Sequence, residues 1–510
     1  MTKPFDLAVI GAGPAGLAAA ATAVRGGLRI ALIDAGSALG GQFWRQPAPV
    51  DAGGPRRDDE AERPADGASN GPADGADHEK ATRAMPLTER ETASLHHDLD
   101  TFHQLRATLR AAEATGQLAL FQNHHVWTIS RDGILSIRMV DRSAGPGNDV
   151  ERIVLSRRLI LATGAFDRQL PFPGWDLPGV MTAGGLQALL KANAVSAGAR
   201  IAIGGTGPFL LPVAAGLAER GADVVGVFES APVTNWSRHL RELASNPAKL
   251  IEGAHYAASF VRHRVPYRSQ TMIVEAHGTD RVEAVTVARL SRGGAIRPGG
   301  RRRVAVDAVG VGWGFTPQLD LAVALGCELR ADIDRSMVVS VDAEQMTSVS
   351  VVFAAGELCG VGGSQLAVRE GQLAGEAVCR SLGLPPVVAT RRERQIRAEI
   401  ARLRRFAVAM HTAHPVPAGW SQALRADTTI CRCEEVPYSA VVAACEAHGA
   451  RDSRQIKQLT RAGMGWCQGR ICGFAADCLA AELNGEPMTP SAAGRSVAVP
   501  VRLGALAATE

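Results

Sequence analysis

Residues 6–16 of this 510-residue chain, DLAVIGAGPAG, decide the fold of its N-terminal part. The apolar run Asp6–Ile10 predicts a buried strand, a glycine-rich turn follows at once, and an Ala-rich segment then predicts a helix. A second apolar strand, Arg29–Ile33, ends at Asp34. This order of strand, glycine turn, helix, strand and acid is the fingerprint of a βαβ unit that binds a dinucleotide.

Each residue of the fingerprint has a physical role. Gly11 allows the tight turn, Gly13 lets the backbone approach a pyrophosphate, and Gly16 lets the helix pack closely on the strand. The first helical turn supplies amide donors and a favourable dipole for phosphates, and Asp34 can accept hydrogen bonds from ribose hydroxyls. We therefore predict a nucleotide site at the start of the chain.

A second, weaker unit of this kind follows further along the chain. Gly205 and Gly207 stand in a predicted strand–helix turn, and the next predicted strand ends at Glu229. Leu210 occupies the position of the third glycine, so this helix cannot pack as closely on its strand. Two interpretations of Gly205, Gly207 and Glu229 stay open: a site for a second adenine nucleotide such as NAD, and an inherited fold without a ligand.

The other elements follow from apolar runs and their boundaries. A stretch from Asp51 to Arg83 carries almost no large apolar side chain, so 51–84 is predicted to be a disordered surface insertion. Helices are predicted over Glu89–Thr115 and, with a basic amphipathic pattern, over Arg391–Phe406. Strands are predicted at Leu118–Gln122, His125–Ser130, Leu135–Val140, Arg157–Ala162, Ile201–Ile203, Val224–Phe228, Ala305–Val311 and within Val351–Glu357, with a turn at Phe315–Pro317.

These elements predict an α/β fold of two dinucleotide-binding units, the second inserted into the first, followed by a small C-terminal module. The predicted boundaries are 1–172 and 319–386 for the first unit, 173–318 for the inserted unit, 387–426 for a linker helix region, 427–484 for the module and 485–510 for a polar tail.

The module carries four cysteines in two close pairs. Cys431 and Cys433 form a C-x-C pair, and Cys467 and Cys472 form a C-x4-C pair. Four thiolates can hold one zinc ion or the two irons of a [2Fe–2S] cluster. Paired zinc ligands usually leave two to four residues between them, so the single-residue gap favours iron–sulfur. A zinc-holding binding protein is the alternative.

Composition and charge narrow the class of protein. The formal net charge is only +4, which gives no argument for a nucleic-acid partner. The start of the chain does not resemble a secretory signal, and its Ala-rich run is too short to span a bilayer. Nine cysteines, an odd number with five scattered singly, do not form a disulfide framework. We expect a cytoplasmic protein without a transmembrane segment.

Several segments together resemble a known group. Gly11–Gly16, Gly40–Gln42, Ala162–Gly164 and Ala355–Glu357 look like the FAD-contacting segments of the two-dinucleotide-binding flavoprotein superfamily, and Gly360–Gly371 looks like a flavin-facing loop and helix start. This resemblance implies a Rossmann-type flavoprotein fold.

The cysteine segments extend the resemblance. Cys431–Val436 and Thr460–Cys472 look like the bacterioferritin-associated ferredoxin-type (BFD-like) [2Fe–2S] module. The combination, over nearly the whole chain except 51–84, resembles the larger subunit of bacterial opine oxidases, D-hydroxyproline dehydrogenases and hydrogen cyanide synthase.

The resemblance implies which residues hold the cofactors, and none of them is assigned to acid–base catalysis. Many relatives in the superfamily carry aspartate at the position of Glu357, whose longer side chain can make the same contact from further back. The [2Fe–2S] cluster would be ligated by Cys431, Cys433, Cys467 and Cys472. FAD would be held by Gly11, Gly13, Pro14, Ala15, Gly16, Asp34, Gly41, Gln42, Val126, Thr163, Gly164, Gly356 and Glu357.

The resemblance also implies partners. A smaller FAD-containing subunit of the D-amino-acid-oxidase type would oxidise a C–N bond, and a small ferredoxin-like subunit is a further candidate. Electrons would pass through the cluster to the FAD of this chain and on to an acceptor such as a quinone, at the periphery of the inner membrane. The rival function is a stand-alone NAD(P)H-dependent reductase, for which Glu229 favours NADH. A disulfide reductase is disfavoured because no cysteine precedes Cys327.

Overall fold

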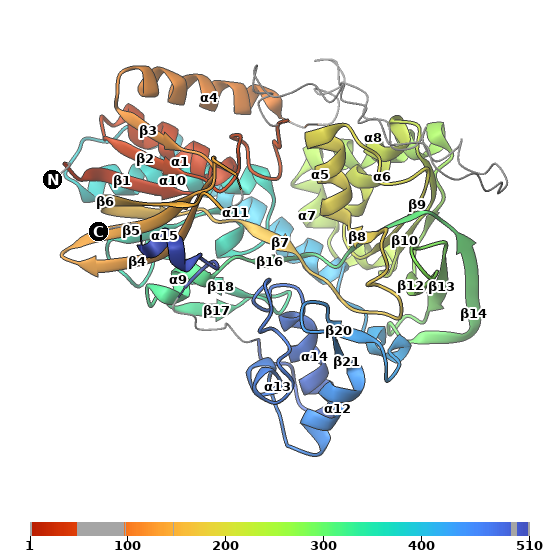
Figure 1. The fold of residues 1–510 in the computed structure, drawn as a ribbon. Coiled ribbons are helices and arrows are strands. Elements are labelled where there is room, and N and C mark those ends of the chain that lie inside the picture. Colours follow the sequence, from red (N-terminus) through yellow and green to blue (C-terminus); the bar gives the residue numbers. More distant parts are fainter. Residues whose placement is uncertain (1–2, 48–95, 97, 146, 491–496, 508–510) are drawn as a thin grey trace, which may run out of the picture.

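The computed structural model describes residues 3–47, 96, 98–145, 147–490 and 497–507. Figure 1 shows two α/β units side by side, with a small helical module below their junction. The predicted α/β class with two nucleotide-type units is confirmed. The predicted insertion 51–84 and the start of the predicted helix Glu89–Thr115 lie outside the described residues.

The first unit is built on a sheet with the strand order β3-β2-β1-β6-β5-β4, in which β19 also pairs with β6. The second half of β6 runs parallel to β1, whereas its first half pairs antiparallel with β5. The strand therefore begins at Val150, earlier than the predicted Arg157–Ala162. The strands are β1 (Phe5–Ile10), β2 (Ile30–Ile33), β3 (Leu118–Phe121), β4 (His124–Asp132), β5 (Ile134–Asp141), β6 (Val150–Leu161) and β19 (Val352–Ala354).

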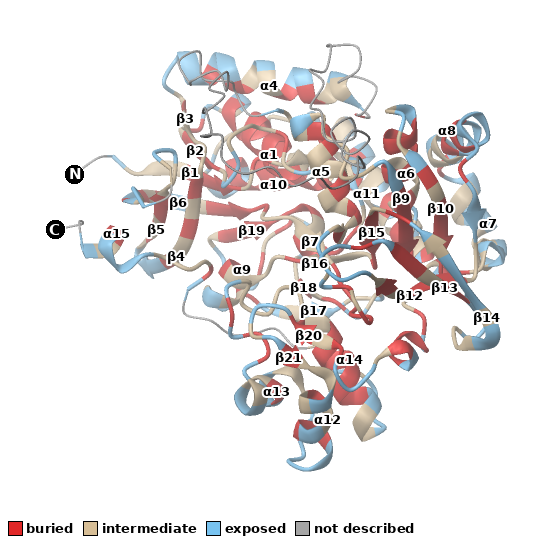
Figure 2. Cartoon of the chain, turned by 45° about the vertical axis from the view of Figure 1, so that its right-hand side comes forward, coloured by how far each residue is buried: buried red, intermediate tan, exposed pale blue. Residues whose placement is uncertain are grey.

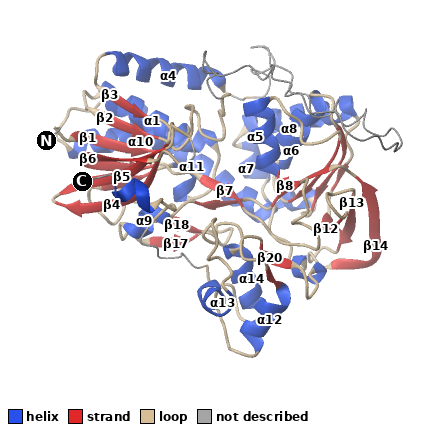
Figure 3. Ribbon diagram, in the orientation of Figure 1, coloured by secondary structure: helices blue, strands red, loops and turns tan. Residues whose placement is uncertain are grey.

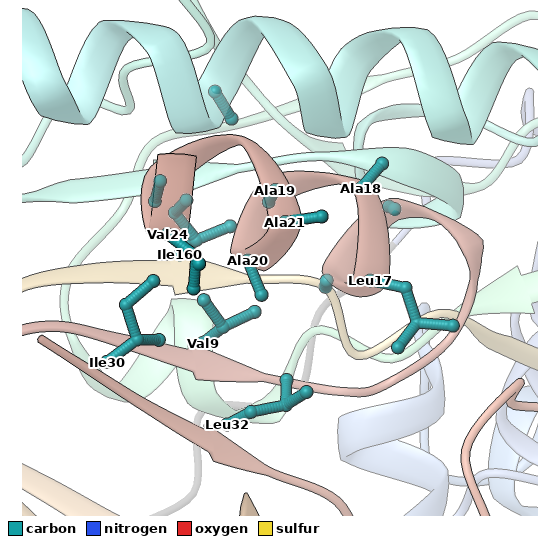
Figure 4. Packing of buried hydrophobic residues seen from close by; sticks show 14 of the residues in the cluster. Val9, Leu17, Ala18, Ala19, Ala20, Ala21, Val24, Ile30, Leu32 and Ile160 are labelled. Atoms are coloured by element: carbon teal, nitrogen blue, oxygen red, sulfur yellow. The ribbon is translucent and has the colours of Figure 1, made fainter. Parts of the chain in front are cut away.

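Two helices, α1 (Pro14–Arg25) and α10 (Ser364–Ser381), pack on one face of this sheet beside α4 (Leu99–Ala114). The small residues of α1 are buried on every side, because the sheet lies under the helix and α10 lies over it. A Cβ at Gly371 would lie 2.1 Å from the Ala15 carbonyl oxygen, so glycine permits this close approach. Figure 4 shows Leu17 and Ala20 on the side of α1 that faces the sheet.

The second unit has a parallel sheet with the order β11-β10-β9-β15-β8. Next to it lies a three-stranded antiparallel sheet, β12-β13-β14, which the sequence analysis did not predict. The strands are β8 (Val180–Thr182), β9 (Arg200–Gly205), β10 (Asp223–Glu229), β11 (Tyr267–Arg268), β12 (Thr271–His277), β13 (Ala284–Leu290), β14 (Ile296–Ala305) and β15 (Ala308–Gly312). The helices are α5 (Ala183–Asn193), α6 (Leu210–Glu219), α7 (Leu240–Ala244) and α8 (Pro247–His263), with the 3-10 turn η1 (Val233–Arg238).

Two predicted elements of this region are wrong. The predicted strand Ala305–Val311 is divided between β14 and β15, because the Asp307 carboxylate accepts hydrogen bonds from the amides of Ala199 and Arg200 and turns the chain there. The predicted turn Phe315–Pro317 is strand β16, which pairs with β7 (Ala165–Asp167) where the chain passes between the units.

The helix predicted over Arg391–Phe406 is longer, spanning Thr390–Ala413 as α11, and it contacts both units. Arg404 binds Glu370 of α10, with 2.6 Å between Nη2 and Oε1. At the end of the helix, the Ala413 carbonyl accepts a hydrogen bond from the Asn235 side chain of the second unit. Shorter elements of the first unit are η2 (Gly356–Cys359), α9 (Asp320–Ala324), β17 (Leu329–Ala331) and β18 (Met337–Val339).

The C-terminal module is small but firmly docked. Its residues Ile430, Val441 and Leu479 share one hydrophobic core with Met272 and Trp313 of the second unit. Figure 2 shows most of α14 buried, and Figure 3 shows that helices dominate the module. The elements are η3 (Trp420–Ala423), β20 (Thr429–Cys431), β21 (Val436–Pro437), α12 (Tyr438–Glu446), α13 (Ser453–Thr460) and α14 (Gly473–Asn484).

Residues 497–507 of the predicted polar tail pack on the first unit. Ala498 is buried, and its amide donates to the Trp127 carbonyl at 2.8 Å. The Arg142 side chain donates to the Pro500 carbonyl at 3.0 Å, ahead of the short helix α15 (Leu503–Ala507). This described segment is therefore packed against the fold rather than extended into solvent.

Candidate cofactor cleft and cysteine cavity

A cleft of about 1810 Å³ runs between the two α/β units. Gly16 lies beneath it, where a Cβ would be 1.7 Å from the Gly11 carbonyl oxygen, so this glycine serves helix packing as predicted. The other residues predicted to hold FAD line the cleft: Gly11, Gly13, Pro14, Ala15, Asp34, Gly41, Gln42, Val126, Thr163, Gly164, Gly356 and Glu357.

The glycine turn leaves room for a phosphate. A Cβ at Gly13 would meet nothing closer than Gly41, 4.0 Å away, so the space beside this residue belongs to the cleft. Asp34 accepts hydrogen bonds from the amides of Ala12 and Gly36 and thereby ties the end of β2 to the turn. Burial raises the pKa of Asp34, and the two amides oppose that rise. This geometry fits the pyrophosphate and ribose of a dinucleotide.

The opposite wall of the cleft is held by a buried charge pair. Glu370 accepts from the Gly356 amide at 3.0 Å through Oε2 and from Arg404 through Oε1. Arg404 also donates to the Gly360 carbonyl at 2.6 Å. Glu357 accepts from the Gly363 amide at 2.9 Å, and burial raises its pKa to about 7. Helix α11 thus fixes the loop that carries Gly356 and Glu357, two of the residues predicted to hold FAD.

Two polar residues of the cleft were not predicted from the sequence. Lys191 of α5 donates to the Phe43 carbonyl at 3.0 Å, and burial lowers the pKa of its ammonium group to about 8. Asp167, at the end of β7, is half-buried; its partial burial raises its pKa, and it accepts from the Gly184 amide at 3.3 Å. Lys191 lies in no motif, whereas Asp167 follows the predicted FAD-contacting segment Ala162–Gly164 by three residues, and this closeness was the available signal.

The second predicted nucleotide site is partly closed. Gly207 and Glu229 line the cleft, whereas Gly205 packs against β15. The Glu229 carboxylate is 2% exposed and accepts from the Thr206 hydroxyl at 3.0 Å and from the Gly207 and Ala231 amides, each at 2.9 Å. These three donors take most of the roughly four lone-pair sites of the carboxylate, so about one is left for a ribose hydroxyl.

A histidine at the end of α11 also faces Glu229. The Trp236 indole donates to His414 Nε2 at 3.0 Å, so in a neutral ring the proton is on Nδ1. Nδ1 lies 3.4 Å from Glu229 Oε2. The end of α11 therefore covers the acid that was expected to select NADH.

The four predicted metal ligands lie together in the module. Cys431, Cys433, Cys467 and Cys472 line a cavity of about 180 Å³. Their side chains pair as Cys431 with Cys472 and as Cys433 with Cys467. The hydrogen bond with Cys472 lowers the pKa of Cys431 to about 5, and the Gly463 amide, 3.4 Å from its sulfur, adds to that effect.

Two pairs of thiols suit two irons, each with two thiolates. Across the described residues, no group of three or more His, Cys, Asp or Glu side chains converges on one point for a single metal ion. Cys431 and Cys472 are buried, whereas Cys433 is exposed. The donor set therefore fits a [2Fe–2S] cluster near the surface.

Polar contacts hold the cysteine cavity against the two units. The Trp175 indole donates to the Thr429 carbonyl at 2.6 Å, and the Arg432 guanidinium lies 4.9 Å from the centre of the Trp175 ring. On the other side Arg470, between two of the cysteines in sequence, binds Asp320 of the first unit at 2.8 Å. Both units thus fix the position of the cavity.

Comparison with known protein families decides the class. Residues 5–377 match the family model described as pyridine nucleotide-disulphide oxidoreductase. The chain belongs to this family. Residues 429–481 match the BFD-like [2Fe–2S] binding domain, close to the predicted module 427–484. This family member is therefore an FAD-dependent oxidoreductase with a [2Fe–2S] cluster, and the zinc alternative is set aside.

Curated relatives match over nearly their whole length. Hydrogen cyanide synthase subunit HcnB of Pseudomonas protegens is 30% identical over 473 residues, which are 92% of this chain and 91% of the relative. An opine oxidase subunit of Agrobacterium tumefaciens is 30% identical over 516 residues, which are 99% of this chain and 91% of the relative. The predicted resemblance to this group is confirmed.

A solved structure supports the fold. L-proline dehydrogenase from P. horikoshii superposes with a TM-score of 0.65 at 18% identity, covering 99% of this chain and 79% of that one. No helix within the described ranges is long and apolar enough to cross a membrane.

Proposed function

We propose that this chain is the electron-transfer subunit of a heteromeric dehydrogenase that oxidises a C–N bond in an amino-acid-like or opine-type substrate. A smaller FAD-containing subunit would carry out the substrate oxidation, and a small ferredoxin-like subunit is a further candidate partner. One observation carries the proposal: the cysteine cavity adjoins the flavin cleft, and its lining includes Trp175, Met181 and Val311 of the second unit. A one-electron and a two-electron carrier are thereby neighbours in one chain.

The names of the relatives support the heteromer. Both are called subunits, of hydrogen cyanide synthase and of opine oxidase, and this chain aligns with 91% of each. In this proposal the residues that line the cleft bind and orient FAD, which supplies hydride and electron chemistry. The four cysteines hold the cluster, which carries single electrons. A cytoplasmic location beside the inner membrane, where a quinone is available, belongs to the same proposal.

The rival function, an NAD(P)H-dependent reductase, is favoured less. Its acid, Glu229, is already bonded by Thr206, Gly207 and Ala231, and His414 covers it. Fewer lone pairs of this carboxylate are therefore left for the ribose of a nicotinamide cofactor than at Asp34, which accepts from two amides. A second adenine nucleotide at Gly205, Gly207 and Glu229 stays a prediction.

The test is to purify the tagged chain together with its smaller flavoprotein partner, and to add candidate substrates under anaerobic conditions. A secondary amine or opine should produce the EPR signal of the reduced [2Fe–2S] cluster in the complex and leave the isolated chain oxidised. A signal of equal size in the isolated chain would assign substrate oxidation to this chain and contradict the proposal.

A further inference from the structure

The flavin cleft and the cysteine cavity meet at one residue. Among the residues that the structure describes, Thr182 alone lines both the cleft of about 1810 Å³ and the cavity of about 180 Å³. Its neighbour Met181 lines only the cavity, and Gly184 lines only the cleft. The wall between the two cofactor sites is therefore one residue thick at this point.

The fold places Thr182 there with little freedom. It is the last residue of β8 and pairs with Val311 of β15, which lines the cavity. It is also the N-cap of α5, and its side-chain oxygen accepts from the Gly185 amide at 2.7 Å. Strand pairing and helix capping together fix both the backbone and the side chain.

A carboxylate lies beside Thr182 on the cleft side. Asp167 lines the cleft, and the Thr182 side chain is near enough to oppose the rise in the pKa of Asp167 that burial causes. Asp167 is itself held by the Gly184 amide, and a Cβ at Gly184 would lie 2.3 Å from the Asp167 carboxylate. The Thr182 side chain therefore caps the helix through its oxygen and lies beside a carboxylate of the cleft.

We infer that Thr182 is a positioning residue for both cofactors and that one-electron exchange between them crosses this residue. The inference rests on the proposed function, because it assumes that FAD and the cluster exchange electrons within this chain. Each crossing removes one electron from one cofactor and adds it to the other, and no atom is transferred. Neighbouring residues are expected to affect one cofactor only.

The test uses the full chain loaded with both cofactors and compares variants by spectroscopy. Thr182→Val removes the hydroxyl and should shift both the visible band of the flavin and the g-values of the reduced cluster, with slower electron exchange after photoreduction. Thr182→Ser should restore both signals. Val311→Ala, in the cavity only, should shift the cluster signal alone, and Gln187→Ala, in the cleft only, should shift the flavin band alone.

Loss of the helix cap lowers stability in Thr182→Val, so Thr182→Asn, which keeps a capping side chain, serves as a second variant. If Thr182→Val and Thr182→Asn leave the spectrum of either cofactor unchanged, the inference that Thr182 positions both cofactors is refuted. Because photoreduction needs neither partner nor substrate, this outcome is independent of the complex. If the substrate experiment fails while the Thr182 variants still change both cofactor spectra and slow electron exchange, the proposed partner is rejected instead.

Discussion

Replacing Arg404 by methionine would leave the carboxylate of Glu370 buried without its partner. The Glu370 side chain is 1% exposed, and Arg404 binds it at 2.6 and 2.9 Å while donating to the Gly360 carbonyl. Removing one member of a buried pair costs roughly 3–5 kcal/mol. Because Arg404 is 26% exposed, we expect a loss of about 3 kcal/mol in the free energy of unfolding of the flavin unit.

Arg392 on the same helix provides a matched control. It lies 3.1 Å from Glu399, and the two side chains are 41% and 28% exposed, so neither charge is buried and Arg392→Met should cost about 0–1 kcal/mol. The assay is urea unfolding followed by flavin fluorescence and circular dichroism. In the double variant Glu370→Gln/Arg404→Met no buried charge is left, so most of the loss should be recovered.

The loss should depend on pH in a defined direction. Burial raises the pKa of Glu370, and Arg404 opposes the rise, so the variant should raise this pKa further. A raised pKa means that the folded state holds the proton more tightly than the unfolded chain, so stability falls as pH rises through it. The defect should therefore shrink as pH falls toward about 5, near the range of a free glutamate. Equal losses for Arg404→Met and Arg392→Met would refute the reasoning.

Cys467→Ala should abolish the [2Fe–2S] EPR signal and leave FAD bound, whereas Cys445→Ala, at a buried cysteine of the same module, should keep the full signal. Gly13→Ala should fold normally but lose FAD, because the added methyl group meets no protein atom closer than 4.0 Å and occupies space for the pyrophosphate. Gly16→Ala should instead lower the unfolding midpoint, since its Cβ would lie 1.7 Å from a backbone oxygen. Burial raises the pKa of Glu357 from 4.5 to about 7, so the folded state holds this proton more tightly than the unfolded chain. The free energy of unfolding of the flavin-free chain should therefore fall as pH rises between these values. Parallel pH profiles of the unfolding free energy for the unchanged chain and Glu357→Gln would argue against this.

Local sequence patterns predicted those features whose defining residues lie close together in the sequence. The strand ending at Ile10 and the turn from Gly11 to Gly16 combine apolar runs with glycines whose spacing has a steric reason. The four cysteines were found in the same way, because ligand pairs lie close together in sequence. Such features need no knowledge of distant contacts.

The missed features depend on contacts between distant segments. Arg404 was one of many arginines in a basic helix, and only the fold shows that it reaches Glu370. Thr182 follows no motif and acquires its place where the strand, helix and cavity meet. The strand predicted over Ala305–Val311 was divided because Asp307 bonds to the amide of Ala199, far away in sequence. The roles of these residues and the end of this strand therefore depend on tertiary contacts, which local sequence patterns do not reveal.

The most direct test of the electron-transfer function is an anaerobic visible spectrum of the purified chain, recorded before and after addition of NADH. Because Glu229 is bonded within the protein and covered by His414, the flavin and iron–sulfur bands should remain unchanged. Rapid bleaching of the flavin band by NADH would contradict the account and establish a stand-alone reductase.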